Sequence, residues 1–253
     1  IPVHTLLDSL QCTLGATINL ARQQVAVSID EFRAVERASG FRINSMHGSL
    51  SADTTAIRVL HLRIETPQTD LLAFGSVRDV NVFAATPNID NAPLDITLRS
   101  ESLASEDLNR CMPGDFVLRD RFVLDSRVSG TLPHLRCDVR TLATRSTALH
   151  GVLLMDNLAN ARPFLYTIEL QPSKVWYTDI RTVLPTLKLG ELDFADHFEF
   201  SPSRIVGSKD SVGGFVDVRG VFGGVRGTIA LAFPGTLRYS VNLSLNKIGR
   251  AHV

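Results

Sequence analysis

Apolar and polar residues alternate along most of this chain. The clearest run lies near the C-terminal end, where Leu237, Tyr239, Val241, Leu243 and Leu245 are apolar and each residue between them is polar. Because successive side chains of a β-strand point to opposite faces, this run predicts a strand with one apolar and one polar face. Related runs recur along the chain and often end at a glycine or proline, so we expect a predominantly β protein.

Residues 57–65 form a second run of this kind. The alternation predicts that Leu60, Leu62 and Ile64 share one face of a strand. Residues 66–69 supply turn chemistry, and an apolar run follows directly, which favours an antiparallel pair. The remaining residues that the alternation assigns to an apolar face are Phe122, Leu124, Phe164, Tyr166, Ile168 and Leu170.

Three segments are exceptions to the strand pattern. Residues 5–20 place several leucines near helical spacing, and we predict a helix there. Short helical inserts are predicted at 105–112 and 177–184, each directly before a proline. The two inserts start 72 positions apart and each follows an alternating strand, which indicates an internal repeat.

Composition narrows the functional classes. The chain has 253 residues and is 44% hydrophobic, which is ample for a folded domain. Lysine plus arginine and aspartate plus glutamate number 26 each, and no basic block stands out, so we expect no nucleic-acid partner. The three cysteines, Cys12, Cys111 and Cys137, lack metal-site spacing, and we expect them to be buried free thiols.

Candidate chemistry is sparse. The densest group of acids and histidine is Asp193, Asp196, His197 and Glu199, which could hold a metal ion. Aromatic and aliphatic residues interleave with this group, however, and we favour an alternating β edge with outward-facing charges. The serine-hydrolase motif GxSxG and the phosphate-binding glycine loops are absent. We therefore expect no enzyme activity, no metal and no cofactor.

The last seven residues, 247–253, break the alternation abruptly. Their sequence, KIGRAHV, matches the translation of a common sequencing-adapter read-through, and we interpret it as an artefact. We expect residues 1–246 to be an internal portion of a longer, repetitive protein.

The serial order of several motifs resembles a known family. The stretch LRIETPQTDLLAFGSV at 62–77, preceded by Ser39, Gly40 and Phe41, resembles the periplasmic repeats of the AsmA-like superfamily, TamB-type translocation and assembly proteins in particular. VSGTLPHLRC at 128–137 is similar to the family's unit of strand, glycine turn and strand. SEDLNRCMPG at 105–114 and TDIRTVLP at 178–185 resemble its helix-plus-proline inserts.

This resemblance implies an elongated, curved antiparallel sheet, an open trough or taco-like β-groove with an apolar inner face and short helical inserts. It implies a periplasmic location in Gram-negative bacteria, with an inner-membrane anchor outside this segment. It also implies phospholipid transport between membranes and support of outer-membrane protein assembly, with a BamA-like or TamA-like barrel protein as a partner. The groove would bind phospholipid acyl chains.

The residues expected to line that groove are Leu60, Leu62, Ile64, Phe122, Leu124, Phe164, Tyr166, Ile168, Leu170, Tyr239, Val241, Leu243 and Leu245. Two alternatives stay open. A scaffold could guide β-barrel precursors by strand pairing at a bare sheet edge. A closed β-sandwich of the adhesin type would instead cover its apolar faces with a second sheet.

Overall fold

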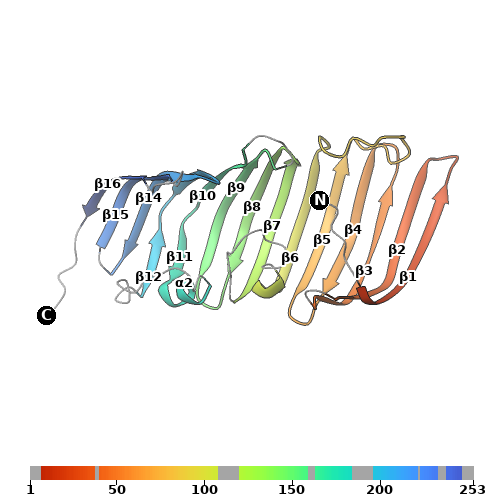
Figure 1. Cartoon of the computed structure of the whole chain (residues 1–253), viewed down its shortest axis with the longest axis horizontal. Helices are drawn as coiled ribbons and strands as arrows, with labels where there is room; N and C mark the ends of the chain where they lie inside the picture. Colours follow the sequence, from red (N-terminus) through yellow and green to blue (C-terminus); the bar gives the residue numbers. More distant parts are fainter. Residues whose placement is uncertain are drawn as a thin grey trace. The chain divides into compact units, whose positions relative to one another are not determined.

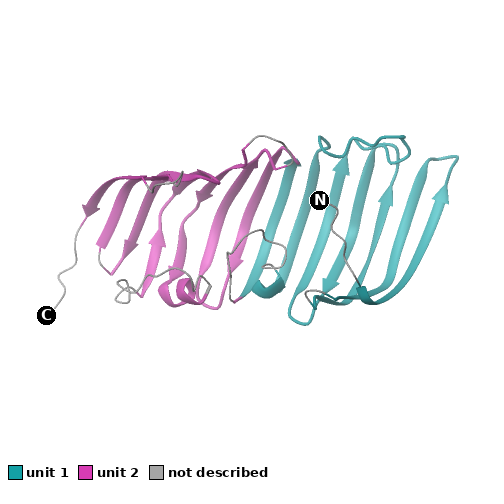
Figure 2. Ribbon diagram, in the orientation of Figure 1, with its two compact units in different colours: residues 1–116, 121–131 teal, residues 117–120, 132–253 magenta. Residues whose placement is uncertain are grey.

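The computed structural model describes residues 7–37, 40–107, 120–158, 163–183, 196–221, 223–232 and 238–246. Strands account for 72% of the residues and helices for 4%, so the predicted all-β, antiparallel fold is confirmed (Figure 1). The chain divides into two compact units (Figure 2). Unit 1 comprises Ile1–Phe116 and Arg121–Thr131, and unit 2 comprises Val117–Asp120 and Leu132–Val253.

Unit 1 is a meander in which each described strand pairs with the strands before and after it in the chain. All of these pairs are antiparallel. The strands are β1 (Leu7–Asn19), β2 (Gln24–Glu36), β3 (Arg42–Ala52), β4 (Ala56–Glu65), β5 (Asp70–Arg78), β6 (Leu94–Ala104) and β7 (Arg121–Thr131). Short polar turns join most of them, as expected for antiparallel neighbours.

The helix predicted at 5–20 is wrong. Residues 7–19 form β1, which pairs with β2 along almost its whole length, and residues 5 and 6 lie outside the described part of the chain. Leu10 and Leu14 fit helical spacing, but with Cys12 between them they fit a two-residue period equally well. The ladder to β2 decides between the two periods, because the backbone groups of this segment pair with β2, whereas a short isolated helix is marginal in water.

Unit 2 contains β8 (His134–Ala143), β9 (Ala148–Asp156), β10 (Leu165–Leu170), β11 (Ser173–Trp176), α2 (Tyr177–Val183), β12 (His197–Phe200), β13 (Ser203–Ser208), β14 (Ser211–Gly220), β15 (Gly223–Ala232) and β16 (Arg238–Asn246). β9 pairs with β8 on one side and with both β10 and β11 on the other. β14 likewise pairs with both β12 and β13. β10 with β11, and β12 with β13, are thus two long strands that are each interrupted once.

A proline causes each interruption. Proline has no N–H to donate to a ladder, and Pro172 and Pro202 stand at the two breaks. The following serine repairs the ladder in both cases. The Ser173 hydroxyl accepts the His150 N–H at 3.0 Å and donates to the Gln171 carbonyl at 2.8 Å.

Ser203 makes the equivalent contacts. Its hydroxyl accepts the Asp217 N–H at 3.0 Å and donates to the Ser201 carbonyl at 2.9 Å. Both x-Pro-Ser sequences therefore bend a strand without leaving the neighbouring N–H unsatisfied.

A hydrogen-bonded corner in unit 1 ties the β4–β5 turn to the helical turn at 105–107. The hydroxyls of Thr66 and Thr69 donate to the Asp107 carboxylate at 2.6 and 2.7 Å. The Thr69 hydroxyl also accepts the N–H of Ala104 at 3.0 Å. Both threonines are buried, so the corner fixes where the helical insert leaves the sheet.

Unit 2 repeats this corner. The Thr144 hydroxyl donates to Asp179 at 2.6 Å, and the Thr147 hydroxyl accepts the Trp176 N–H at 3.0 Å. Asp179 lies in the first turn of α2, which confirms the helix predicted from Tyr177 onward. Residue 184 of that helix, and residues 108–112 of the earlier one, lie outside the described part of the chain. The predicted repeat thus has a structural basis in two T-x-x-T turns, each bound to an aspartate.

Candidate apolar binding faces

One face of the unit 1 sheet is apolar from β1 to β7. Directly paired residues point to the same face, so the strand register assigns each position to a face. One row across the strands consists of Leu14, Ile29, Gly48, Leu62, Ala73, Leu98 and Ser126. The three other complete rows are Ile18, Val25, Ala52, Ile57, Val77, Leu94 and Gly130; Ala16, Val27, Leu50, Val59, Gly75, Ile96 and Val128; and Cys12, Phe32, Met46, Ile64, Leu71, Ser100 and Leu124. These rows contain no charged side chain, and we call this surface the unit 1 apolar face.

The opposite face of unit 1 is polar and carries ion pairs between neighbouring strands. Arg63 on β4 donates two hydrogen bonds to Asp70 on β5, at 2.8 and 2.7 Å. Arg127 on β7 donates two to Asp95 on β6, at 2.7 and 2.5 Å. This face is suited to water, because its charges are paired in fork geometry and remain partly exposed.

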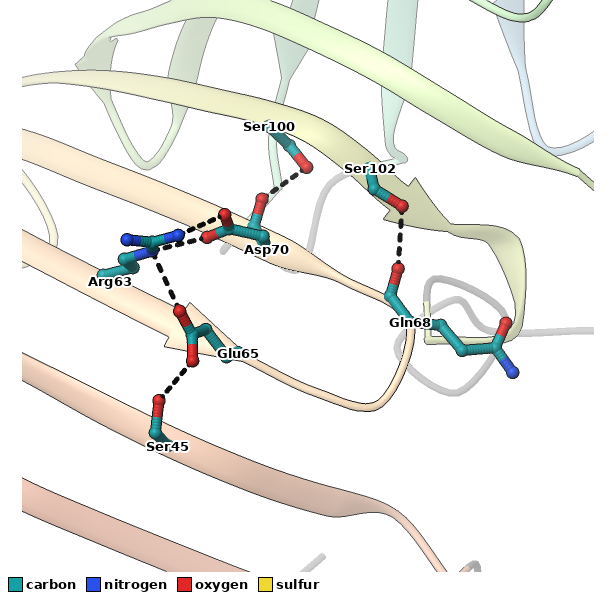
Figure 3. Close-up of polar contacts among 7 residues, drawn as sticks. All are labelled: Ser45, Arg63, Glu65, Gln68, Asp70, Ser100 and Ser102. Atoms are coloured by element: carbon teal, nitrogen blue, oxygen red, sulfur yellow. Dashed lines mark hydrogen bonds and ion pairs between the residues drawn. The ribbon is translucent and has the colours of Figure 1, made fainter.

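Figure 3 shows the polar contacts around the β4–β5 turn. Glu65 accepts a hydrogen bond from the Ser45 hydroxyl at 2.7 Å and lies 3.1 Å from the Arg63 guanidinium. On the other side of the turn, the hydroxyls of Ser100 and Ser102 donate to the backbone carbonyls of Asp70 and Gln68. Four strands are joined here, β3 to β6, so the contacts hold the sheet edge in register.

Hydrogen bonds from neighbouring side chains lower the pKa values of three carboxyl groups in unit 1. Hydrogen bonds from Arg63 lower the pKa of Asp70, and those from Arg127 lower the pKa of Asp95. The pKa of Asp53 is lowered by hydrogen bonds from Thr55 and Arg58. In each case the ionised carboxylate is the form that the donors favour.

Aromatic side chains on the polar faces are covered by arginine. The Arg99 guanidinium lies 5.5 Å from the ring centre of Phe74 in unit 1, and Arg226 lies 5.2 Å from that of Phe215 in unit 2. Such stacking is a cation–π contact that also shields the ring from water. The polar faces therefore present charged side chains to solvent even where they contain a phenylalanine.

Glycine is required at two positions on the apolar faces. Gly75 and Gly214 have φ angles of +152° and +156°. A Cβ atom at these positions would meet the backbone carbonyl oxygens of Asp95 and Arg204 on the adjacent strands. Only glycine allows the backbones to lie this close, so these residues are structural.

The unit 2 sheet also has an apolar face. One row consists of Leu135, Met155, Tyr166, Gly207, Val212, Leu231 and Tyr239. The next row consists of Cys137, Leu153, Ile168, Ile205, Gly214, Ile229 and Val241. Shorter rows add Val139, Gly151 and Leu170; Val216, Gly227 and Leu243; and Val218, Val225 and Leu245. We call this surface the unit 2 apolar face.

Aromatic packing fills part of the unit 2 apolar face. The ring of Tyr166 lies over Gly207, where a Cβ atom would collide with it. Phe164 stands beside it, with ring centres 6.1 Å apart. The large ring thus covers a backbone that glycine leaves bare, which is a known way to stabilise a glycine within a sheet.

Neither apolar face is covered by a second β-layer within its own unit. In the described part of each unit, strands pack extensively only against their hydrogen-bonded neighbours, and each unit forms a single layer of strands (Figure 1). Side chains toward the ends of the sheet are strongly exposed: Leu14 is 58% exposed and Val241 is 52% exposed. Large exposed apolar surfaces of this kind mark binding sites on soluble proteins.

Most of the predicted lining residues share a face within their unit. In unit 1, the register places Leu62, Ile64, Phe122 and Leu124 together, although Phe122 is buried. In unit 2 it joins Tyr166, Ile168, Leu170, Tyr239, Val241, Leu243 and Leu245. That lipid contacts these residues stays a prediction.

The predicted position of Leu60 is wrong. Leu62 pairs with Gly48, but Val59 pairs with Leu50, so β4 has one more residue than β3 between these pairs. This β-bulge shifts the alternation, and Val59 rather than Leu60 continues the apolar face. Leu60 is 59% exposed.

Several residues of the unit 1 apolar face were not among the predicted groove residues. These are Val27, Ile29, Leu50, Ile96 and Leu98. The same alternation marks them in the sequence. Only the register shows that successive strands turn these residues toward one side, since bulges interrupt the ladders between several of them.

The rejected metal site has no counterpart in the described residues, where no group of three or more metal-ligating side chains occurs. His197 packs against Trp176, with ring centres 5.3 Å apart, and its Nε2 lies 3.5 Å from a Glu199 oxygen. Asp193 lies outside the described residues. His197 and Glu199 lie on β12, which pairs with β11 on one side and β14 on the other, so this segment is an interior strand and the predicted edge position is wrong.

The cysteine prediction is partly wrong. Cys12 is exposed on β1, and Cys137 is half-buried on β8. Cys111 lies outside the described residues. Among the described strands β1 pairs with β2 alone, and Cys12 is exposed there.

The chain matches no protein-family model, and neither the curated proteins nor the solved structures contain a match to it. Within the described ranges, none of the helices has the length and hydropathy needed to cross a membrane. The two apolar faces are therefore the features of the described residues that point to a function.

Proposed function

We propose that this chain is a noncatalytic segment of a cell-envelope protein whose apolar faces bind phospholipid acyl chains. In the full protein these faces would let lipid move between the inner and outer membranes across the periplasm, as in the TamB-type proteins that the sequence resembles. The single observation that supports this most is the unit 1 apolar face, which runs across β1–β7 without a charge and without a covering β-layer in the described residues.

The chemistry of the face fits acyl chains better than a compact ligand. Burial of apolar surface is worth about 25 cal/mol per Å², or about 0.8 kcal/mol for each methylene removed from water. Aliphatic rows offer this contact at every position and few polar groups that would fix one orientation. A ligand with long methylene chains gains most from such a surface, and it can shift along the rows at little cost.

The polar faces support the same assignment. Their paired charges, such as Arg63 with Asp70, keep one side of each sheet in water. A sheet with one hydrated and one apolar side needs a partner for the apolar side only. The closed-sandwich alternative requires a second β-layer, and each unit has one layer in its described part.

Site-specific photocrosslinking tests the proposal. A photoreactive residue at Leu98, on the unit 1 apolar face, should capture phospholipid in cells. The adjacent Thr97 lies on the polar face of the same strand and is the matched control. Leu243 and Asn242 form the equivalent pair on β16. Capture at Thr97 and Asn242 but not at Leu98 and Leu243 would refute the proposal.

The strand-pairing scaffold is a second candidate, and one observation favours it. β16 pairs with β15 only among the described strands, and all of its residues are exposed. A client strand could add to such an edge through backbone hydrogen bonds. Crosslinks from β16 to barrel precursors, with none to phospholipid at Leu98, would favour this function over lipid binding.

A further inference from the structure

The strands β11 and β12, with α2 directly after β11, lie together at the lower end of unit 2 (Figure 1). Four residue pairs join β11 to β12 in an antiparallel ladder, and the first of them is Ser173 with Phe200. We call the described residues of this substructure, 173–183 and 196–200, the flap.

Few backbone pairs hold the flap to the strands on either side of it. Within the described residues, β11 has one pair with β9, Lys174 with Ala148, and β12 has two pairs with β14. By contrast, β9 pairs with β8, and β14 with β15, along most of their length. Segments with few hydrogen bonds to their surroundings open locally at a lower free-energy cost than the strands beside them. The flap is thus bound more firmly to itself than to the rest of the sheet.

Two prolines mark the joint between the flap and the rest of the sheet. The β10–β13 ladder ends at Leu170 and Ser203, and two residues of each strand separate this pair from the first pair of the flap. Pro172 and Pro202 are among these residues, and neither has an N–H that could bond to the opposite strand. Both strands can therefore bend at this joint without the loss of a ladder pair between them.

The polar face has space beside this joint. Arg219 pairs with Glu199, and Glu199 pairs with Lys174, so these charged residues share the polar face. Together with Pro172 and Pro202 they line a hollow of about 470 Å³. A flap that turned toward the polar face would enter this hollow rather than a packed core.

Hydrogen bonds to the T-x-x-T corner of unit 2 hold the flap in its observed position. The Thr144 hydroxyl donates to Asp179 of α2 at 2.6 Å, and the Trp176 N–H donates to the Thr147 hydroxyl at 3.0 Å. Unit 1 has the same corner, but its helical turn follows β6, which is unbroken from Leu94 to Ala104. Among the described residues, the corner is thus combined with a proline joint in unit 2 alone, where it can act as a latch.

We propose that the flap opens as one piece toward the polar face, bends at Pro172 and Pro202, and releases its latch at Thr144. The β11–β12 ladder stays intact in the open form, because its four pairs lie within the flap. The ladders of β9 with β8 and of β14 with β15 also stay intact.

Opening changes the unit 2 apolar face. Phe200 pairs with Val218, which lies on that face, and the alternation of β12 places Phe198 there as well. Opening moves both rings away from the strands beside them and uncovers the lower end of the face. An acyl chain could then enter the face from this end, a consequence that rests on the proposed function.

Hydrogen exchange of the full chain, followed by mass spectrometry, tests the latch. The bonded amides of β11 and β12 should exchange faster than those of β9 and β14. Thr144→Val removes the hydrogen bond to Asp179 and should speed exchange in β11 and β12 by about tenfold, with β14 unchanged, because the closed form loses one hydrogen bond. Thr66→Val, the equivalent change in unit 1, is the matched control and should leave exchange in the flap as in the wild type.

Replacement of both prolines tests the joint. Pro172→Val combined with Pro202→Val gives each strand an N–H that can bond across the gap, and exchange in β11 and β12 should slow. Equal exchange of β11 and β14 in the wild type, no effect of Thr144→Val, or exchange that fails to slow in the double variant would each overturn the inference.

Photocrosslinking in cells separates the flap from the proposed function. A photoreactive residue at Leu170, on the unit 2 apolar face beside the joint, should capture less phospholipid in the double proline variant than in the wild type. Capture at Leu98 in unit 1 should be equal in both. Equal capture at Leu170 would overturn the role of the flap in lipid entry and leave the proposed function standing. No capture at either position, with exchange as expected, would refute the proposed function and leave the motion of the flap standing.

Discussion

At the scale of single residues, the ion pairs of the polar faces couple stability to pH. Asp95 accepts two hydrogen bonds from Arg127, and its folded pKa is lowered from the ordinary value of 3.8. A lowered folded pKa contributes stability above the unfolded pKa, and this contribution is lost as the pH falls through the folded value. Asp70 beside Arg63 behaves in the same way.

The urea midpoint of the wild-type protein should therefore fall as the pH is lowered below about 4. Asp95→Asn removes one of the titrating groups, so its midpoint should depend less steeply on pH in this range. The effect should be small, because both side chains are partly exposed, and it should shrink further in high salt. Asp90→Asn, in the loop between β5 and β6, serves as the control and should keep the wild-type slope. Parallel curves for Asp95→Asn and wild type would contradict this assignment.

At the scale of elements, the two T-x-x-T corners connect a strand turn to the first turn of a helix. Thr69 is 7% exposed, and its hydroxyl donates to Asp107 and accepts the N–H of Ala104. Buried polar groups that lose a partner cost more than the hydrogen bond itself. The corner is thus a sensitive point of unit 1.

Thr69→Val should lower the free energy of unfolding by about 1–3 kcal/mol, because it keeps the shape of the side chain and removes the hydroxyl. Urea denaturation followed by circular dichroism measures the change. Thr97→Val, on the polar face of β6, is the matched control and should change stability by less than about 0.5 kcal/mol. Equal losses in the free energy of unfolding for the two substitutions would show that the Thr69 hydroxyl stabilises the fold no more than the Thr97 hydroxyl does.

At the scale of the whole molecule, two units each carry an apolar face. Leu98 lies in an interior strand of unit 1 and Ile168 in an interior strand of unit 2. If each face binds lipid by itself, substitutions on the two faces should reduce the amount of bound lipid additively, because independent sites have additive effects.

Leu98→Asp and Ile168→Asp should each reduce the co-purified phospholipid by roughly half, and the double variant should lose nearly all of it. Mass spectrometry of extracted lipid gives the stoichiometry, and circular dichroism checks that the sheets are intact. Thr97→Asp and Thr167→Asp place the same charge on the polar faces of the same strands and should retain wild-type lipid. Full loss from one single variant would mean that the two faces do not bind independently.

The sequence predicted the strands better than it predicted which residues lie on the apolar faces. Alternation located β16 (Arg238–Asn246) and its apolar residues, because a two-residue period is a local property. The leucines of β1 fit both a helical and a strand period, and only pairing with β2 decided between them. The bulge after Val59 is marked in the sequence only by two adjacent apolar residues, Val59 and Leu60, and only the pairing with β3 shows that Val59 continues the apolar face. One extra residue there was enough to displace a predicted lining position.

By itself, the sequence determined the all-β class, the amphipathic character of the strands and where the two short helical inserts begin. These follow from local periodicity and from turn and capping residues, which act within a few positions. The tertiary structure decided the register, the bulges and the side to which each strand turns its apolar residues. Those features depend on hydrogen bonds between distant segments, and only they join separate apolar runs into a continuous face.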